Sequence, residues 1–115
     1  MIKMYGIASC GSVKKAMQYF KEKAIAFEFI DFKKEPISDQ LLEEWLKQKT
    51  LEELVNKKGT TFRTLNPDEK AAMQDLQKAK KLILQKNNLI KRPVLMKNKK
   101  IVFIGFDIET YSSIF

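Results

Sequence analysis

The sequence predicts an α/β fold in which a strand–helix–strand unit and a later hairpin–helix unit flank an inserted helical block. Three observations predict it. Short apolar or alternating segments near both ends of the chain are typical of strands, and the apolar positions of the middle recur at helical spacing. The order of elements between Ile2 and Phe32 is strand, helix, strand, which implies a parallel pair joined by a right-handed crossover.

The N-terminal unit is predicted from three segments. Ile2–Tyr5 is a short apolar strand, and Ala26–Phe32 alternates in polarity and is rich in Phe and Ile, as a second strand would be. Ser12–Lys23 lies between them and is predicted to be an amphipathic helix. Its small or apolar positions are Val13, Ala16, Met17 and Phe20.

The inserted helical block is predicted to span about residues 37–88. Ser38 is a suitable cap for a helix that continues to about Lys47. The segment Thr50-Leu51-Glu52-Glu53 has capping-box spacing and begins a second, short helix. The apolar face of the first helix consists of Leu41, Leu42, Trp45 and Leu46.

The second half of this block contains a predicted loop and a further helical stretch. Asn56–Thr64 is interpreted as a polar loop. Asn66-Pro67-Asp68-Glu69 then begins a helix, because it combines a capping residue, proline at the first position and acids in the first turn. Helical pattern continues, with at least one break, to about Gln85, and Asn87-Asn88 ends it.

The C-terminal unit is predicted to be a hairpin and a helix. Val94–Met96 and Ile101–Ile104 are short apolar strands, and Asn98-Lys99 lies at the turn between them. Asp107–Ser113 has helical pattern. With no repeat, low-complexity segment or linker in the sequence, residues 1–115 are expected to form a single domain.

Composition narrows the class of protein. Hydrophobic residues make up 44% of the chain, enough for a core, yet no apolar run is long enough to span a bilayer. Met1 leads directly into the first strand, so no signal-peptide pattern is present. One cysteine cannot form an internal disulfide, so any disulfide must join another molecule. These features predict a cytoplasmic protein without a membrane partner.

The absence of histidine excludes several kinds of chemistry. The chain has no histidine at all. General acid–base catalysis by histidine, Cys–His dyads and Ser–His–Asp triads are therefore excluded. A metal site of the Cys/His type is not expected either.

The charge of the chain is strongly basic but dispersed. The net charge is +8, with acidic residues interleaved among the basic ones. This pattern favours a solvated lysine surface over a nucleic-acid footprint. Of the 22 basic residues only Arg63 and Arg92 are arginine. Arginine offers a planar fork for oxyanions that lysine lacks, although a structural ion pair is an equal interpretation for Arg63. For Arg92 the site interpretation is favoured.

The single cysteine, Cys10, lies where the first strand meets the first helix, within Ser9-Cys10-Gly11-Ser12. The N–H groups of a helix start have no helical partner, and together with the helix dipole they favour an anion. Lys14 and Lys15 add positive charge nearby. The thiolate is the reactive form of cysteine, so this placement predicts a nucleophile. A small core hydrophobe is the alternative, and placement alone leaves both open.

Pro93 stands just before the first strand of the hairpin. Proline cannot donate a hydrogen bond to a neighbouring strand, so it marks a strand start or a bend. The Arg92–Pro93 bond can be cis at small cost, and the sequence leaves its isomer open.

With these segments in this order, the chain resembles the arsenate-reductase-related (ArsC/Spx-like) family of the thioredoxin fold. It is most similar to the small members that resemble glutathione-linked thiol reductases. The resemblance covers nearly the whole chain, and the combination is specific although each piece alone is weak. The matching pieces are Tyr5–Ala16, Asn56–Arg63, Leu89–Val94 and Val102–Phe106.

The resemblance implies a site. Cys10 matches the nucleophile of the family, and Arg92 matches an arginine that stabilises the thiolate and binds a substrate oxyanion. It further implies that Pro93 is cis, that Arg92 points at the Cys10 sulfur, and that the insert is the helical subdomain of the family. The expected substrate-binding residues are Ser9, Gly11, Ser12, Lys14, Pro93 and Arg63. Lys14 is the weaker candidate, and for Thr60, Thr61 and Arg63 a structural role is an equal interpretation.

The sequence also departs from its relatives. Arsenate reductases of this type carry two further arginines, where this chain has Asn56 and the region of Gly105-Phe106. Their absence argues against arsenate as the physiological substrate. Spx-type regulators usually carry a Cys-x-x-Cys pair and a basic C-terminal extension. Here Val13 occupies the second cysteine position, and no such extension is present.

The resulting hypothesis is a monothiol oxidoreductase without a bound cofactor. Cys10 would attack a small-molecule or protein disulfide, and an external thiol, glutathione or a glutaredoxin, would resolve the mixed disulfide. The alternative is an Spx-like regulator that binds RNA polymerase without contacting DNA. A third interpretation is a family member whose redox activity has lapsed.

Overall fold

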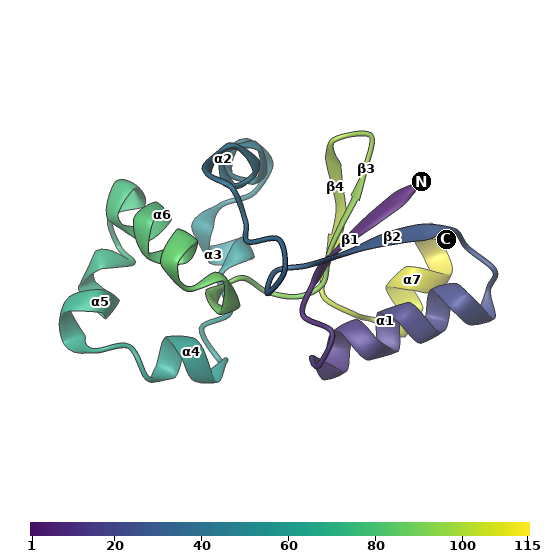
Figure 1. The fold of residues 1–115 in the computed structure, drawn as a ribbon, viewed down its shortest axis with the longest axis horizontal. Coiled ribbons are helices and arrows are strands. Elements are labelled where there is room, and N and C mark those ends of the chain that lie inside the picture. The colour runs from purple at the N-terminus through teal and green to yellow at the C-terminus, as the bar shows by residue number, and fades with distance from the viewer. The chain divides into compact units, whose positions relative to one another are not determined.

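The computed structural model describes residues 1–115, which divide into two compact units (Figure 1). The first combines Met1–Glu35 with Arg92–Phe115 and contains all the strands, so we call it the sheet unit. The second, Pro36–Lys91, is the helical unit. No helix of the chain is both long and apolar enough to cross a membrane.

The sheet unit is built on four strands in the order β2-β1-β3-β4. β1 (Ile2–Gly6) pairs in parallel with β2 (Phe27–Asp31) and antiparallel with β3 (Val94–Lys97). β4 (Lys100–Ile104) completes the hairpin with β3. The predicted parallel pair and the predicted hairpin are thus confirmed. β1 lies inside the sheet, so its carboxyl end is flanked by strands on both sides.

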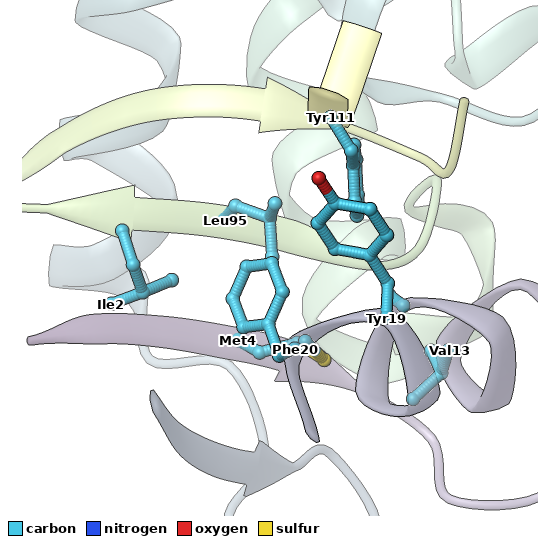
Figure 2. Close-up of a cluster of buried hydrophobic side chains, with 8 residues drawn as sticks. Ile2, Met4, Val13, Tyr19, Phe20, Leu95 and Tyr111 are labelled. Atoms are coloured by element: carbon cyan, nitrogen blue, oxygen red, sulfur yellow. The ribbon is translucent and has the colours of Figure 1, made fainter. Parts of the chain in front are cut away.

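Two helices, α1 (Gly11–Glu22) and α7 (Ile108–Ile114), contribute to the core of this unit. Each begins within a residue of its predicted start. Figure 2 shows side chains of β1, β3, α1 and α7 meeting in one apolar cluster. Tyr111 of α7 is fully buried there, and its hydroxyl donates a hydrogen bond to the Gly105 carbonyl at 2.6 Å. The cluster consists of Ile2, Met4, Val13, Ala16, Tyr19, Phe20, Leu95 and Tyr111.

The helical unit begins with the two capped helices that the sequence predicts. α2 (Asp39–Gln48) is capped by Ser38, whose Oγ accepts a hydrogen bond from the Leu41 N–H at 3.0 Å. α3 (Leu51–Leu54) begins with a complete capping box between Thr50 and Glu53. Leu42 and Trp45 of α2 are fully buried.

The remaining helices of this unit follow the predicted helical stretch. α5 (Pro67–Ala72) has a second capping box, between Asn66 and Glu69. The predicted break falls between α5 and α6 (Leu76–Gln85), whose cap is Asp75. A short 3₁₀ turn, η1 (Asn87–Leu89), comes where the helical pattern was expected to end.

One prediction for the helical unit is wrong. Asn56–Thr64 was expected to be a loop throughout, but Thr60–Arg63 form a helical turn, α4. A tight turn at Asn56 precedes it, in which the Asn56 carbonyl accepts from the Gly59 N–H at 3.2 Å. The N-cap of α4 is Gly59, which has no side chain that would indicate a helix start in the sequence. The two threonines that follow have low helix propensity, so the segment does not have the composition of a helix.

Candidate active site

The site forms where β1 ends and α1 begins. After Gly6 the chain turns, and the turn is closed by a hydrogen bond from the Cys10 N–H to the Ile7 carbonyl at 3.0 Å. Cys10 is the N-cap of α1, with an extended backbone (φ −73°, ψ 130°), and its carbonyl accepts from the Lys14 N–H at 3.0 Å. The backbone therefore fixes the half-buried thiol at the helix start.

The first turn of α1 provides two of the groups that act on the sulfur. The oxygen of a normal N-cap side chain accepts from the N–H two or three positions later. Cys10 makes no conventional capping hydrogen bond, but the N–H groups of Val13 and Ser12 act on its sulfur and favour the thiolate. The twelve residues of α1 also place the positive end of their dipole here.

The third group comes from a distant part of the sequence. Arg92 precedes β3, and Val94 of β3 pairs with Tyr5 of β1. This pairing brings Arg92 beside the turn after β1, where its guanidinium donates a hydrogen bond to the Cys10 sulfur. The Arg92–Pro93 bond is cis. Both expectations for this segment, the cis bond and the position of Arg92 at Cys10, are confirmed.

These groups determine the direction in which the pKa of Cys10 moves. Burial raises the pKa of the thiol, but the N–H of Val13, the guanidinium of Arg92 and the N–H of Ser12 together outweigh burial. The pKa of Cys10 therefore lies below that of an ordinary cysteine. A larger thiolate fraction near neutral pH follows, and the thiolate is the nucleophile.

The other expected site residues are distributed unevenly. Ser9, Gly11, Ser12 and Lys14 are exposed around Cys10, and Pro93 is buried next to Arg92. Arg63 lies in the helical unit, exposed at the last turn of α4. Arg92 is thus the one arginine of the unit that contains Cys10. No group of three or more Cys, Asp or Glu side chains lies close enough together to hold a metal ion.

Val13 has a part beyond the core position that its helical spacing predicts. Its N–H, one of the helix-start N–H groups of residues 11–13 that were expected to stabilise the thiolate, is the strongest of the influences that lower the pKa of Cys10. Val13 stands three residues after Cys10. That is the position whose N–H an N-cap side chain normally engages.

A four-stranded sheet with a single cysteine of lowered pKa at the start of its first helix, and a cis-proline before the strand that pairs with β1, is typical of a thioredoxin-like protein. A sequence model of the ArsC family matches residues 5–114. The chain therefore belongs to the ArsC family, which has a thioredoxin-like fold.

Solved structures and curated relatives agree with this assignment. The solved structure of a protein named YFFB is 34% identical, with a TM-score of 0.88 over 99% of this chain and 98% of that one. An arsenate reductase (ArsC) related protein from Brucella melitensis is 33% identical, with a TM-score of 0.79 over 97% and 92% of the two chains. The global transcriptional regulator Spx 2 of Oceanobacillus iheyensis is 33% identical over 86% of this chain and 73% of its own length.

Proposed function

We propose that this protein is a monothiol oxidoreductase in which Cys10 is the nucleophile. The observation that carries the proposal is the convergence of the Val13 and Ser12 N–H groups and the Arg92 guanidinium on the one cysteine of the chain. Relatives described as arsenate reductase related support a redox role for this site.

The chemistry proceeds in two exchange steps. The Cys10 thiolate attacks one sulfur of a disulfide, for example a glutathione mixed disulfide, so that a new S–S bond forms and the other sulfur leaves as a thiolate. A second thiolate, from glutathione or a glutaredoxin, then attacks the mixed disulfide and releases the Cys10 thiolate. In sum, one S–S bond breaks for each that forms: one sulfur of the substrate is released as a thiolate, and the external thiol ends in a disulfide with the sulfur that Cys10 had carried. The external thiol is required because Cys10 has no partner cysteine within the chain.

Each site residue has a definite part in this scheme. Arg92 and the two N–H groups stabilise Cys10 as the attacking and as the leaving thiolate. Ser9, Ser12, Gly11 and Lys14 form the exposed surroundings that the substrate meets first. Glutathione is a co-substrate and no cofactor is bound. A reducing compartment such as the cytoplasm supplies the thiols this chemistry needs.

The test is the intact mass of the protein after incubation with oxidised glutathione. We expect one glutathionyl adduct, formed at neutral pH and removed by reduced glutathione or by glutaredoxin. Cys10→Ser should show no adduct. A wild-type protein that stays unmodified under conditions where a free thiol peptide reacts would refute the proposal.

A second candidate function has a specific observation in its favour. Besides the Oceanobacillus protein, a relative from Enterococcus faecalis that is 27% identical is also a global transcriptional regulator Spx. The alternative is therefore a regulator that binds RNA polymerase without touching DNA. Its test is direct binding of the purified chain to RNA polymerase, with Cys10→Ser compared. Binding that is equal in both variants, together with no glutathionyl adduct, would favour this candidate.

A further inference from the structure

We propose that Gly6 is a positioning residue for the Cys10 thiol. Because Gly6 has no Cβ, the side chain of Val13 can seat the first turn of α1 against the end of β1, and this contact holds the Ser12 and Val13 N–H groups at the sulfur. The inference rests on the proposed thiol chemistry, but its test reads the state of the thiol and not turnover. Failure of the positioning role of Gly6 is therefore distinguishable from failure of the proposed oxidoreductase function.

The contact is unusually close. A Cβ built on Gly6 would lie 2.6 Å from Cγ2 of Val13 and 3.7 Å from its Cγ1, and real Cβ atoms essentially never come within 3.0 Å of a heavy atom outside their own residue and its chain neighbours. Gly6 does not have a positive φ, so backbone conformation does not require glycine here. The requirement is for space alone.

Neither side of the contact can yield easily. Gly6 is buried, and its carbonyl accepts from the Phe32 N–H at 2.8 Å, so the end of β1 is held to the segment after β2. Val13 is fully buried among the core side chains that Figure 2 shows. A β-branched side chain in a helix has one strongly preferred rotamer, so Val13 cannot swing aside. A methyl group on residue 6 would therefore push the first turn of α1 itself.

Moving this turn would act on the thiol directly. Val13 connects the packing contact to the thiol, because its side chain contacts Gly6 while its N–H acts on the Cys10 sulfur. Ser12 precedes it in the same turn. Hydrogen bonds weaken steeply when distance and angle depart from their optimum. A shift of this turn would therefore reduce the stabilisation of the thiolate.

The experiment is a double-mutant cycle with the pH dependence of Cys10 alkylation by iodoacetamide as its readout. We expect Gly6→Ala to raise the pKa of Cys10 by about 1. Val13→Ala opens a gap at the same contact and should raise the pKa by less. In Gly6→Ala/Val13→Ala the new methyl group enters that gap, so the pKa should return close to the value of Val13→Ala alone.

Each result decides the question. A merely structural role would lower the melting temperature without moving the pKa, so folded Gly6→Ala with the wild-type pKa would overturn the proposal. A double variant no closer to the wild type than Gly6→Ala would overturn it too. If Gly6→Ala does not fold, Val13→Ala decides: a raised pKa supports the positioning role, and a wild-type pKa refutes it.

Discussion

The Arg92 guanidinium acts on the Cys10 thiol in two ways, as a hydrogen-bond donor and as a positive charge. An ammonium could replace part of the charge effect but not the planar geometry of the donor. Arg92 thus contributes to the thiolate more than a surface lysine would. This is the reason to distinguish it from the lysines that make up nearly all of the positive charge of the chain.

The first prediction concerns substitutions of Arg92. Arg92→Met removes both effects and should raise the pKa of Cys10 by about 1, since a nearby opposite charge typically shifts a pKa by about 1 to 3. Arg92→Lys should raise it by less. The measurement is iodoacetamide alkylation as a function of pH. Lys97→Met, which removes one exposed positive charge from β3, serves as the matched control and should leave the pKa unchanged.

The second prediction links the thiol to stability. The pKa of Cys10 is lowered in the folded protein, whereas the thiol of the unfolded chain has a pKa of about 8.5. Between these two values the unfolded chain binds more protons, so the free energy of unfolding gains a contribution that grows with pH. This contribution is complete above the unfolded pKa and is lost as pH falls through the folded pKa.

Cys10→Ser lacks this contribution and isolates it. Urea denaturation under reducing conditions should show wild type gaining stability relative to Cys10→Ser as pH rises from below the lowered folded pKa to above the ordinary thiol pKa of about 8.5. A difference that stays constant with pH, or that shrinks as pH rises, would contradict a lowered thiol pKa.

The site residues differ in how well their roles could be predicted from the sequence. Cys10 was predictable because its signal is local: a lone thiol between a strand and a helix start. The contact of Arg92 with the sulfur was expected only from the family resemblance, since the pairing of β3 with β1 creates it across most of the chain. The Gly6–Val13 contact depends on how closely α1 approaches β1, and no pattern of residue types reports that distance.

At the scale of elements, capping residues determine where most helices of the helical unit begin. Ser38, Thr50, Asn66 and Asp75 each accept a backbone hydrogen bond at the start of a helix. Side-chain caps of this kind can be recognised in a sequence, and the sequence predicts three of these four, at Ser38, Thr50 and Asn66. α4 was missed because its N-cap is Gly59, which has no side chain to reveal it.

The third prediction tests the cap of α2. Ser38→Ala removes the acceptor of the Leu41 N–H and should lower the free energy of unfolding by about 1 kcal/mol. Ser38→Asn keeps a good capping residue and should stay close to wild type. Trp45, the one tryptophan of the chain, is fully buried in α2, so its fluorescence during denaturation reports on this unit. Equal loss in both variants would show that the cap is not the cause.

At the scale of the whole molecule, the order of elements was predictable because each strand and most helices carry their own local signal. The β1–β2 pair follows from the strand–helix–strand order, and the β3–β4 hairpin from its short turn. The place of β1 between β2 and β3 was not derivable from those signals, because sequence pattern does not report which distant strands pair. The pairing of β3 with β1 brings Arg92 to Cys10, a position of Arg92 that the family resemblance implied.

The last prediction separates two substrates. We expect exchange with a glutathione disulfide to be readily measurable and reduction of arsenate to be weak or absent. A tetrahedral oxyanion keeps its hydration unless several strong donors converge on it, and Arg92 is the one arginine in the unit that contains Cys10. Attack on a disulfide requires a thiolate with a free approach instead, and Cys10 meets this requirement through its lowered pKa and partial exposure.

A coupled assay with glutathione, glutaredoxin and arsenate decides between them, with Cys10→Ser as the blank. Exchange with glutathione disulfide in the same preparation shows that the Cys10 thiol is active. Oxidation of the sample is then excluded as the cause of a low rate of arsenate reduction. Arsenate turnover as fast as disulfide exchange, and lost in Cys10→Ser, would mean that the exposed lysines and backbone N–H groups near Cys10 replace the missing arginines. Disulfide exchange without arsenate turnover would instead mean that the Cys10 thiolate serves thiol–disulfide exchange and not the reduction of arsenate.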